Sequence, residues 1–352
     1  MGSDDTGQPI FSVLVKRTYD LLPGKTLVPA AGQLPLRDVD EYWEPDPERS
    51  TVRYESELAA FKTCTDVVVV GKAYAPYGKP VAAFEAAVEV GNCRKAIRVF
   101  GNRQCVYRPA AVPQFTDPVP VSEVELRYEK AYGGSDRLGS DGEVFAYPRN
   151  RLGTGFAIEN RHEKVHGLPL PQLEDPDDLL TPDRVVVGEP CNWHQQPLPA
   201  NLGWFGRTDY PRCSFVGSIP SFISVHTALR EEKLGLIPVS QIALARQFRL
   251  PSFDARFNSG ASLGLSLPFL CGDERIRLKN VSPEGTIEFR LADDRPRLML
   301  DIGLGENELE ALIHTVQVRV ENSQVDVVWR GAHHFPGLDW LTQLKRFRAE
   351  VT

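Results

Sequence analysis

The sequence predicts a mainly β protein, a β-rich α+β fold in which two antiparallel β-sheet or sandwich subdomains carry long ordered loops and a few short helices. Several short segments alternate apolar and polar residues at the two-residue period of a half-buried strand. The 28 prolines and 28 glycines supply closely spaced turns between them. An apolar share of 42% in 352 residues is enough to bury a large core, and this length favours more than one packed subdomain.

The first predicted subdomain, residues 8–112, contains a series of short strands. Residues 11–19 alternate in polarity and run into a turn at 22–25, so a hairpin is expected to return at 26–28. The strands and turns that follow are expected at 66–73, 77–79 (turn), 81–90, 91–92 (turn) and 95–100. This order is typical of an antiparallel meander.

The predicted middle segment, residues 113–270, is rich in loops and packs on both β subdomains. Prolines recur over 109–120, which favours extended linker geometry, and one strand is expected at 124–128. Gly, Pro, Asp and Asn are then frequent up to Gly217, which predicts ordered loops that cover the sheets. Apolar residues three apart predict a short packing helix at 240–248.

The second predicted β subdomain, residues 271–352, repeats the meander pattern and ends in a helix. Its strands are expected at 275–279, 286–291, 297–301, 316–320 and 325–329. The terminal helix follows Pro336, because apolar residues recur there at helical spacing, and it is expected to dock on the body of the protein. These apolar residues are Leu338, Leu341, Leu344 and Phe347.

The charge balance disfavours anionic partners. A net charge of −7 and a pI of about 5.6 indicate a surface that repels phosphate backbones and anionic lipid headgroups. No nucleic acid and no membrane is therefore expected as a partner. One local basic cluster is interpreted as an ordinary solvated face. It consists of Arg94, Lys95, Arg98, Arg103 and Arg108.

The chain is expected in the cytoplasm. Its N-terminus, MGSDDTGQ, lacks the basic start and the apolar core of a secretory signal, and no apolar stretch reaches the length of a membrane span. The 6 cysteines form no CxxC pair, so we expect reduced, largely buried thiols and no disulfide.

One catalytic motif is a possible zinc site. Residues 162–166 spell HEKVH and fit the HExxH pattern, in which two histidines one helical turn apart bind zinc and the glutamate, here Glu163, activates water. That chemistry needs a helix of several turns, whereas Gly167 and Pro169 follow at once. A metal-dependent hydrolase is therefore one alternative function, and a chance match in a loop is the favoured interpretation.

A second motif is a possible serine nucleophile. Residues 260–264 spell GASLG and match GxSxG, with Ser262 at its centre and Asp301 followed by His314 or His333 in α/β-hydrolase order. The alternating strands and helices of that fold are absent from the pattern, so a serine hydrolase is also disfavoured. No recurrent zinc spacing occurs among Cys191, His194, Cys213, His333 and His334. We therefore expect no catalytic residue, no metal and no cofactor.

Several sequence blocks follow one another along roughly residues 13–331. They are RYESELAAFK from Arg53, TDVVVVGKAYAP from Thr65, IRVFGNR from Ile97, RYEKAYGGSD from Arg127, YPRNRLGTGF from Tyr147, GLPLPQLEDP from Gly167, FDARFNSGA from Phe253, HTVQVRV from His314 and VVWRG from Val327. Together they resemble a bacterial family catalogued as a domain of unknown function and associated with type VI secretion effector adaptors. The charges of RYESELA and the glycines of AYGGSD suit buried ion pairs and turns.

The resemblance implies a non-enzymatic adaptor or chaperone. Such a protein holds a toxic effector in the cytoplasm and helps to load it on a spike made of a VgrG-type trimer and a PAAR-type tip. Its partners would be that effector and a spike component, bound through an exposed aromatic patch. The alternative for these aromatics, that they fill the core beneath the loops, is favoured by their residue type. The candidate partner-binding residues are Trp193, Trp204, Phe205, Phe215 and Phe222.

Overall fold

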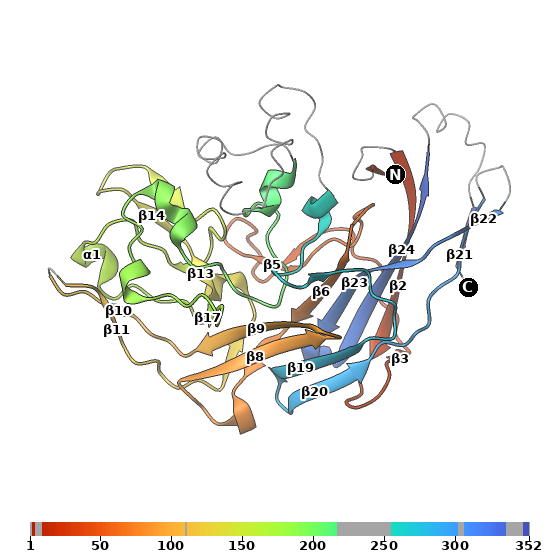
Figure 1. The fold of residues 1–352 in the computed structure, drawn as a ribbon, viewed down its shortest axis with the longest axis horizontal. Helices are drawn as coiled ribbons and strands as arrows, with labels where there is room; N and C mark the ends of the chain where they lie inside the picture. The colour runs from red at the N-terminus through yellow and green to blue at the C-terminus, as the bar shows by residue number, and fades with distance from the viewer. Residues whose placement is uncertain are drawn as a thin grey trace.

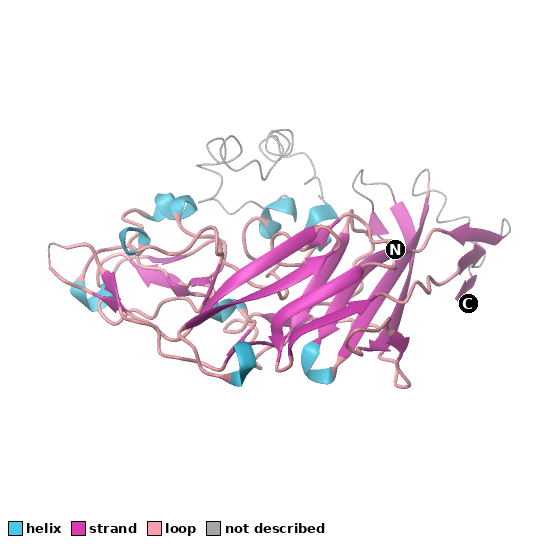
Figure 2. Cartoon of the chain, turned by 60° about the horizontal axis from the view of Figure 1, so that its bottom comes forward, coloured by secondary structure: helices cyan, strands magenta, loops and turns pink. Residues whose placement is uncertain are grey.

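The computed structural model describes residues 2–3, 9–109, 111–216, 255–301, 306–335 and 348–351. Long strands gather in one part of the molecule, and a lobe of loops and short helical turns forms the other part, on the left in Figure 1. Figure 2 shows the same division from a second direction. The predicted mainly β fold with antiparallel sheets, long ordered loops and short helices is confirmed.

The larger of the two main sheets has seven strands, in the order β1-β2-β24-β23-β6-β18, with β3 also pairing with β2. Their bounds are β1 Gly2–Ser3, β2 Pro9–Asp20, β3 Val28–Pro29, β6 Thr65–Val70, β18 Ser266–Leu267, β23 Leu312–Arg319 and β24 Gln324–His334. The pairing of β2 with β24 is antiparallel along its whole length, from Ile10 opposite His334 to Asp20 opposite Gln324.

One pair in this sheet departs from the predicted antiparallel order, because β6 and β23 are parallel. Every residue of β6 is buried, as expected for a parallel strand that is covered on both faces. The other edge of β6 is also occupied, since Val67 N–H donates to Leu265 C=O and Val69 N–H donates to Leu202 C=O. Parallel strands need a long connection, and the middle segment supplies part of it.

The second main sheet is antiparallel and has five strands, in the order β17-β9-β8-β19-β20. Their bounds are β8 Ala83–Val90, β9 Cys93–Phe100, β17 Leu173–Glu174, β19 Arg275–Ser282 and β20 Gly285–Arg290. The predicted turn between β8 and β9 contains Gly91 at a φ of 55°, a left-handed conformation that glycine adopts without a steric cost. In β19, Ile276 and Leu278 are buried whereas Arg275 and Arg277 are exposed, which is the alternation of a sheet with one buried face.

The two main sheets share a single apolar core. Val316, Val318 and Val327 of the larger sheet belong to the same buried cluster as Val88 and Leu278 of the second sheet. Strands from 8–112 and from 271–352 occur in both sheets, so these two ranges build one pair of sheets together. The short pairs attached to this body are β4 Glu41–Tyr42 with β5 Val52–Tyr54, β7 Lys72–Tyr74 with β12 Glu123–Glu125, and the sheet of β21 Leu298–Asp301, β22 Glu306–Leu309 and β25 Arg348–Val351.

The loop-rich lobe has its own core, in which aromatic and aliphatic side chains pack together. The Tyr147 ring meets those of Tyr132 and Trp193 edge to face, at centroid distances of 5.1 and 6.2 Å. The glycines of AYGGSD allow a close approach here, because a Cβ on Gly133 would lie 2.1 Å from the Asn150 carbonyl oxygen. The elements of this lobe are β10 Cys105–Val106, β11 Gln114–Phe115, β13 Tyr132–Gly133, β14 Ser135–Arg137, β15 Val144–Ala146, β16 Thr154–Gly155 and α1 His162–Val165.

The predicted helices, cysteine states and membrane spans can also be compared with the structure. The helices predicted at 240–248 and after Pro336, and also Phe222, lie outside the described residues. The cysteines are free thiols, but only Cys105 is buried and Cys93 and Cys271 are exposed, so the prediction of largely buried thiols is wrong. Among the described residues, no helix has the length and apolar character needed to cross a membrane.

Shortening a side chain in the shared core should destabilise the whole protein. Leu278 is fully buried, and its replacement in Leu278→Ala should cost about 2–5 kcal/mol of unfolding free energy, because it leaves a cavity. Urea denaturation measures this value. The neighbouring exposed variant Arg277→Ala is the matched control and should change stability by less than about 1 kcal/mol. Equal effects of the two variants would contradict the proposed packing.

Candidate functional site

The larger sheet has a buried polar face opposite its apolar one. In the HTVQVRV block on β23, Val316 and Val318 enter the shared core, so Thr315, Gln317 and Arg319 point to the other side. All three of these polar residues are buried. We call this surface the polar face, and it consists of Lys16, Thr18, Asp66, Thr315, Gln317, Arg319 and Asp326.

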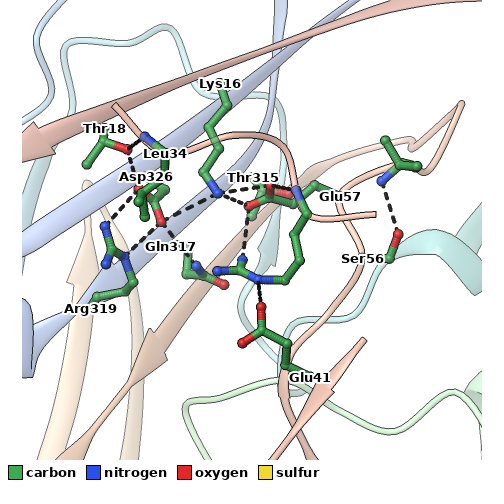
Figure 3. A network of polar contacts seen from close by, with 12 residues as sticks. Lys16, Thr18, Leu34, Glu41, Ser56, Glu57, Thr315, Gln317, Arg319 and Asp326 are labelled. Atoms are coloured by element: carbon green, nitrogen blue, oxygen red, sulfur yellow. Dashed lines mark hydrogen bonds and ion pairs between the residues drawn. The ribbon is translucent and has the colours of Figure 1, made fainter. Parts of the chain in front are cut away.

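Asp326 is the centre of the polar face (Figure 3). Its carboxylate is fully buried and accepts hydrogen bonds from Thr18 Oγ1 at 2.8 Å and from Arg319 Nε at 2.9 Å. Lys16 Nζ lies 3.8 Å from the same carboxylate. A buried carboxylate is stable only when charged partners and hydrogen bonds replace its water. These side chains, from the two strands that flank β24, provide them.

Lys16 also connects the polar face to the loop that covers it. Its Nζ donates to both carboxylate oxygens of Glu57, at 2.7 and 2.9 Å, as Figure 3 shows. Glu57 in turn accepts the backbone N–H of Arg37 at 2.7 Å. A second buried pair, Lys62 Nζ with Asp66 Oδ2 at 2.7 Å, fixes the end of the same loop. The loop is therefore held on the sheet by desolvated ion pairs.

Glu55 joins this loop to the segment that carries the predicted aromatic patch. Its buried carboxylate accepts Arg212 Nη1 at 2.8 Å and Arg207 Nε at 2.7 Å. Burial alone would raise the pKa of Glu55, but Arg212 and Arg207 outweigh it and hold the pKa below its ordinary value. The buried ion pairs predicted for RYESELA are thus confirmed at Glu55 and Glu57.

Over part of β2, one edge of the larger sheet has no partner strand among the described residues. The backbone N–H and C=O groups of Thr18 point away from β24, as their hydrogen bonds to the Gln33 side chain show. Alternate residues of an antiparallel strand face the same way, so Ser12, Leu14 and Lys16 also direct their N–H and C=O groups outward. Within the described part of the chain, no backbone or side-chain group pairs with these outward backbone groups.

The exposure of Lys16 supports this assignment. Its side chain is only 2% exposed, yet the residue as a whole is only partly buried. The exposed atoms at this position therefore belong to the backbone. The open edge, Ser12 to Lys16, is bounded by β1 at one end, where Ser3 lies opposite Pro9, and by β3 at the other.

The HExxH residues do not form the helix that the zinc chemistry requires. Helix α1 has a single turn and ends at Val165, and His166 already has an extended backbone. The His162 and His166 rings stack at a centroid distance of 4.8 Å, and Glu163 is exposed. In the described ranges, no group of three or more His, Cys, Asp or Glu residues, including Cys191, His194 and Cys213, is arranged to hold a metal.

Ser262 is buried and serves packing. Its Oγ donates to the Gly203 carbonyl at 2.8 Å and shares a hydrogen bond with the Tyr128 hydroxyl at 2.8 Å. His314 is also buried on β23, where burial lowers its pKa well below the ordinary value. Neither His314 nor His333 is among the hydrogen-bond partners of Ser262 within the described residues, and Asp301 lies at the end of β21.

Four of the five predicted partner-binding aromatics lie inside the protein. Trp193 belongs to the core of the loop-rich lobe, while Trp204 and Phe205 belong to the shared core. Trp204 Nε1 donates to Gln317 Oε1 at 3.0 Å, so this indole also completes the polar face. Phe215 is 7% exposed. Their role in partner binding stays a prediction, and these four side chains form no exposed patch.

Sequence reasoning missed the open edge of β2 and the placement of Arg103. Alternating residues identified β2 as a strand, but strand neighbours are set by long-range pairing. Arg103 stood in a cluster interpreted as a solvated face, whereas the residue is buried and lines a cleft. The glycine and asparagine before it, Gly101 and Asn102, were the available sign that the strand ends there and the chain turns inward.

The fold and the site define a mainly β scaffold, and buried ion pairs hold its covering loops on the sheet. The chain belongs to a bacterial family described as "Uncharacterized protein conserved in bacteria (DUF2169)", which matches residues 6–330. This confirms the resemblance to a bacterial domain of unknown function. No curated protein and no solved structure matches the chain.

Removing the central carboxylate of the polar face should strongly destabilise the fold. In Asp326→Ala the Arg319 guanidinium loses its buried partner, which should cost about 3–5 kcal/mol of unfolding free energy. The matched control is Glu321→Gln, which removes the partly exposed pair of Glu321 with Arg53 at 3.4 Å and should cost less than about 1 kcal/mol. Chemical denaturation of both variants checks the difference, and a small effect at Asp326 would contradict its central role.

The Glu55 ion pairs should give a defined pH dependence. A carboxylate with a lowered folded pKa stabilises the protein above its unfolded pKa, and this stabilisation is lost as the pH falls through the folded pKa. Glu55→Gln should therefore lower the unfolding free energy by about 3–5 kcal/mol at pH 7. The difference in unfolding free energy between the variant and the unchanged protein should become smaller below about pH 4.5. Denaturation curves across this range test the idea, with Glu308→Gln as a surface control. A gap that stays constant with pH would count against it.

Proposed function

We propose that this protein is a non-enzymatic adaptor that binds an extended segment of a partner protein along the open edge of β2. The observation that carries this proposal is the run of outward backbone groups at Ser12, Leu14 and Lys16, which lacks a partner strand within the described residues. An open strand edge pairs readily with another polypeptide, and strand addition is a common mode of peptide recognition.

The surroundings of the edge support a role in binding. The strand behind it is paired with β24 along its whole length, so a partner strand would extend an existing sheet and not a flexible loop. On one face, Lys16 is locked by Glu57, and Ser12 Oγ donates to the Ala60 carbonyl at 2.7 Å. The edge is thus held in its binding geometry before the partner arrives, which lowers the entropic cost of association.

The resemblance to type VI secretion adaptors supports a more specific form of the proposal. In that form the partner is a toxic effector, and the adaptor loads it in the cytoplasm on a spike of VgrG and PAAR proteins. A rigid β scaffold that presents a preformed edge suits a protein that must hold a partner and then release it. The HExxH and GxSxG residues take no part in this function, and their contacts described above support structural roles for them.

A proline at the edge provides a sharp test. Leu14→Pro removes an outward N–H but no hydrogen bond to β24, so an edge strand tolerates it. Co-expressed with the effector encoded beside it, the protein should retain the effector at least about tenfold less well, because one backbone bond and the close approach of the strand are lost. Affinity co-purification measures this.

The control is Leu14→Ala, which shortens the same side chain and keeps the N–H. It should retain the effector. Circular dichroism and urea denaturation establish that both variants fold. A folded Leu14→Pro protein that still retains the effector would rule out strand addition at this edge.

A further inference from the structure

A polar cleft lies where the segment after β9 meets the turn at 127–130. It has a volume of about 280 Å³ and is lined by Asn102, Arg103, Gln104, Arg127, Glu129 and Lys130, with parts of 154 and 169–172. Four of the blocks that carry the family resemblance, beginning at Ile97, Arg127, Tyr147 and Gly167, therefore meet at this one place. None of its residues belongs to the polar face or to the open edge of β2.

Arg103 provides a buried donor at this cleft. The residue is 9% exposed, and its guanidinium lies 3.8 Å from the centre of the Phe100 ring. One of its nitrogens, Nη2, pairs with Glu174, but Nε is buried without a hydrogen-bond partner among the described residues. Burial lowers the pKa of Arg103 to about 10, so the group remains protonated at neutral pH. An unpaired buried donor of this kind is costly unless a ligand satisfies it.

Lys130 provides a second unused cation. The structure records no ion pair or hydrogen bond for Lys130 Nζ within its described ranges, although the residue is half-buried. The charge of Arg127 is shared between two carboxylates, since its Nη1 lies 3.0 Å from Glu44 and its Nε lies 3.4 Å from Glu125, although this Nε, like that of Arg103, has no hydrogen-bond partner among the described residues. Lys130 therefore supplies the unpaired charge at the cleft, and Arg103, whose charge is paired with Glu174, supplies an unpaired N–H.

The acidic groups at the cleft are occupied elsewhere. Glu129 directs one oxygen to the Thr51 N–H at 2.8 Å and the other to Thr51 Oγ1 at 2.6 Å. Glu174 uses its second oxygen to accept the Leu180 N–H at 2.7 Å. Neither carboxylate neutralises Lys130, and Glu129 still adds one negative charge to the lining. This combination suits a monoanion better than a doubly charged phosphate.

We propose that this cleft binds a carboxylate carried by a partner polypeptide, either an acidic side chain or a C-terminal carboxylate. Lys130 Nζ and Arg103 Nε donate to the two carboxylate oxygens. The exposed side-chain amides of Asn102 and Gln104 at the rim are placed to bond the peptide groups beside it. The inference rests on the proposed function, because the carboxylate belongs to the bound partner. It adds to the open edge of β2 a second point of contact with that partner.

Short peptides test the site without the intact partner. The probes are acetyl-Gly-Gly-Gly with a free C-terminus, acetyl-Gly-Glu-Gly-amide, and the neutral control acetyl-Gly-Gln-Gly-amide. NMR titration of the full-length protein gives each dissociation constant. At least one carboxylate peptide should bind about tenfold more tightly than the neutral one, because a charge-assisted hydrogen bond is gained. The tighter of the two identifies the source of the carboxylate.

The informative variant is Lys130→Gln, because Nζ forms no ion pair or hydrogen bond with the residues that the structure describes, so its loss should leave the fold intact. It should weaken the carboxylate peptides about tenfold, whereas Lys79→Gln, at an exposed lysine on another turn, should leave them unchanged. Equal binding of all three peptides, no binding of any, or no effect of Lys130→Gln would overturn the proposal. Any of these results leaves the co-purification test with Leu14→Pro unaffected, so the two proposals fail separately.

Discussion

The structure depends on the pairing of charges on the polar face of the larger sheet. This sheet has two buried faces, and only one of them is apolar. On the other, the carboxylate of Asp326 is neutralised by Arg319 and Lys16, and Lys16 is shared with Glu57. Because unpaired charges at this depth would be prohibitively costly, the covering loop has only one favourable position on the sheet.

That constraint explains how a protein with so much loop can present fixed surfaces. The loop over the polar face is fixed at Glu55, Glu57 and Lys62 by side chains from the sheet and from the segment around Arg212. The second core, of aromatic and aliphatic side chains, holds the remaining loops of the lobe. Recognition sites of proteins are often loops on a rigid scaffold. In this protein, buried ion pairs connect the loops to the sheet.

Much of the fold follows from local pattern. The strands predicted at 11–19, 81–90, 95–100, 275–279 and 325–329 all occur, because alternation of apolar residues and turn-forming glycines act within a few residues. The buried ion pairs of RYESELA were also predictable from residue type. The parallel pairing of β6 with β23 was not, because a uniform run of valines fits either direction.

The sequence by itself determined the fold class, the strand positions and the dominance of loops in the middle of the chain. The tertiary structure alone decided which strands share a sheet, which stretch of β2 is left open, and that Arg103 and Lys130 meet at one cleft. The physical reason is the sequence separation of the interacting residues. Strands and turns depend on neighbouring residues. Strand partners, the burial of a charge and the lining of a cleft depend on segments that are far apart in the chain and meet only on folding.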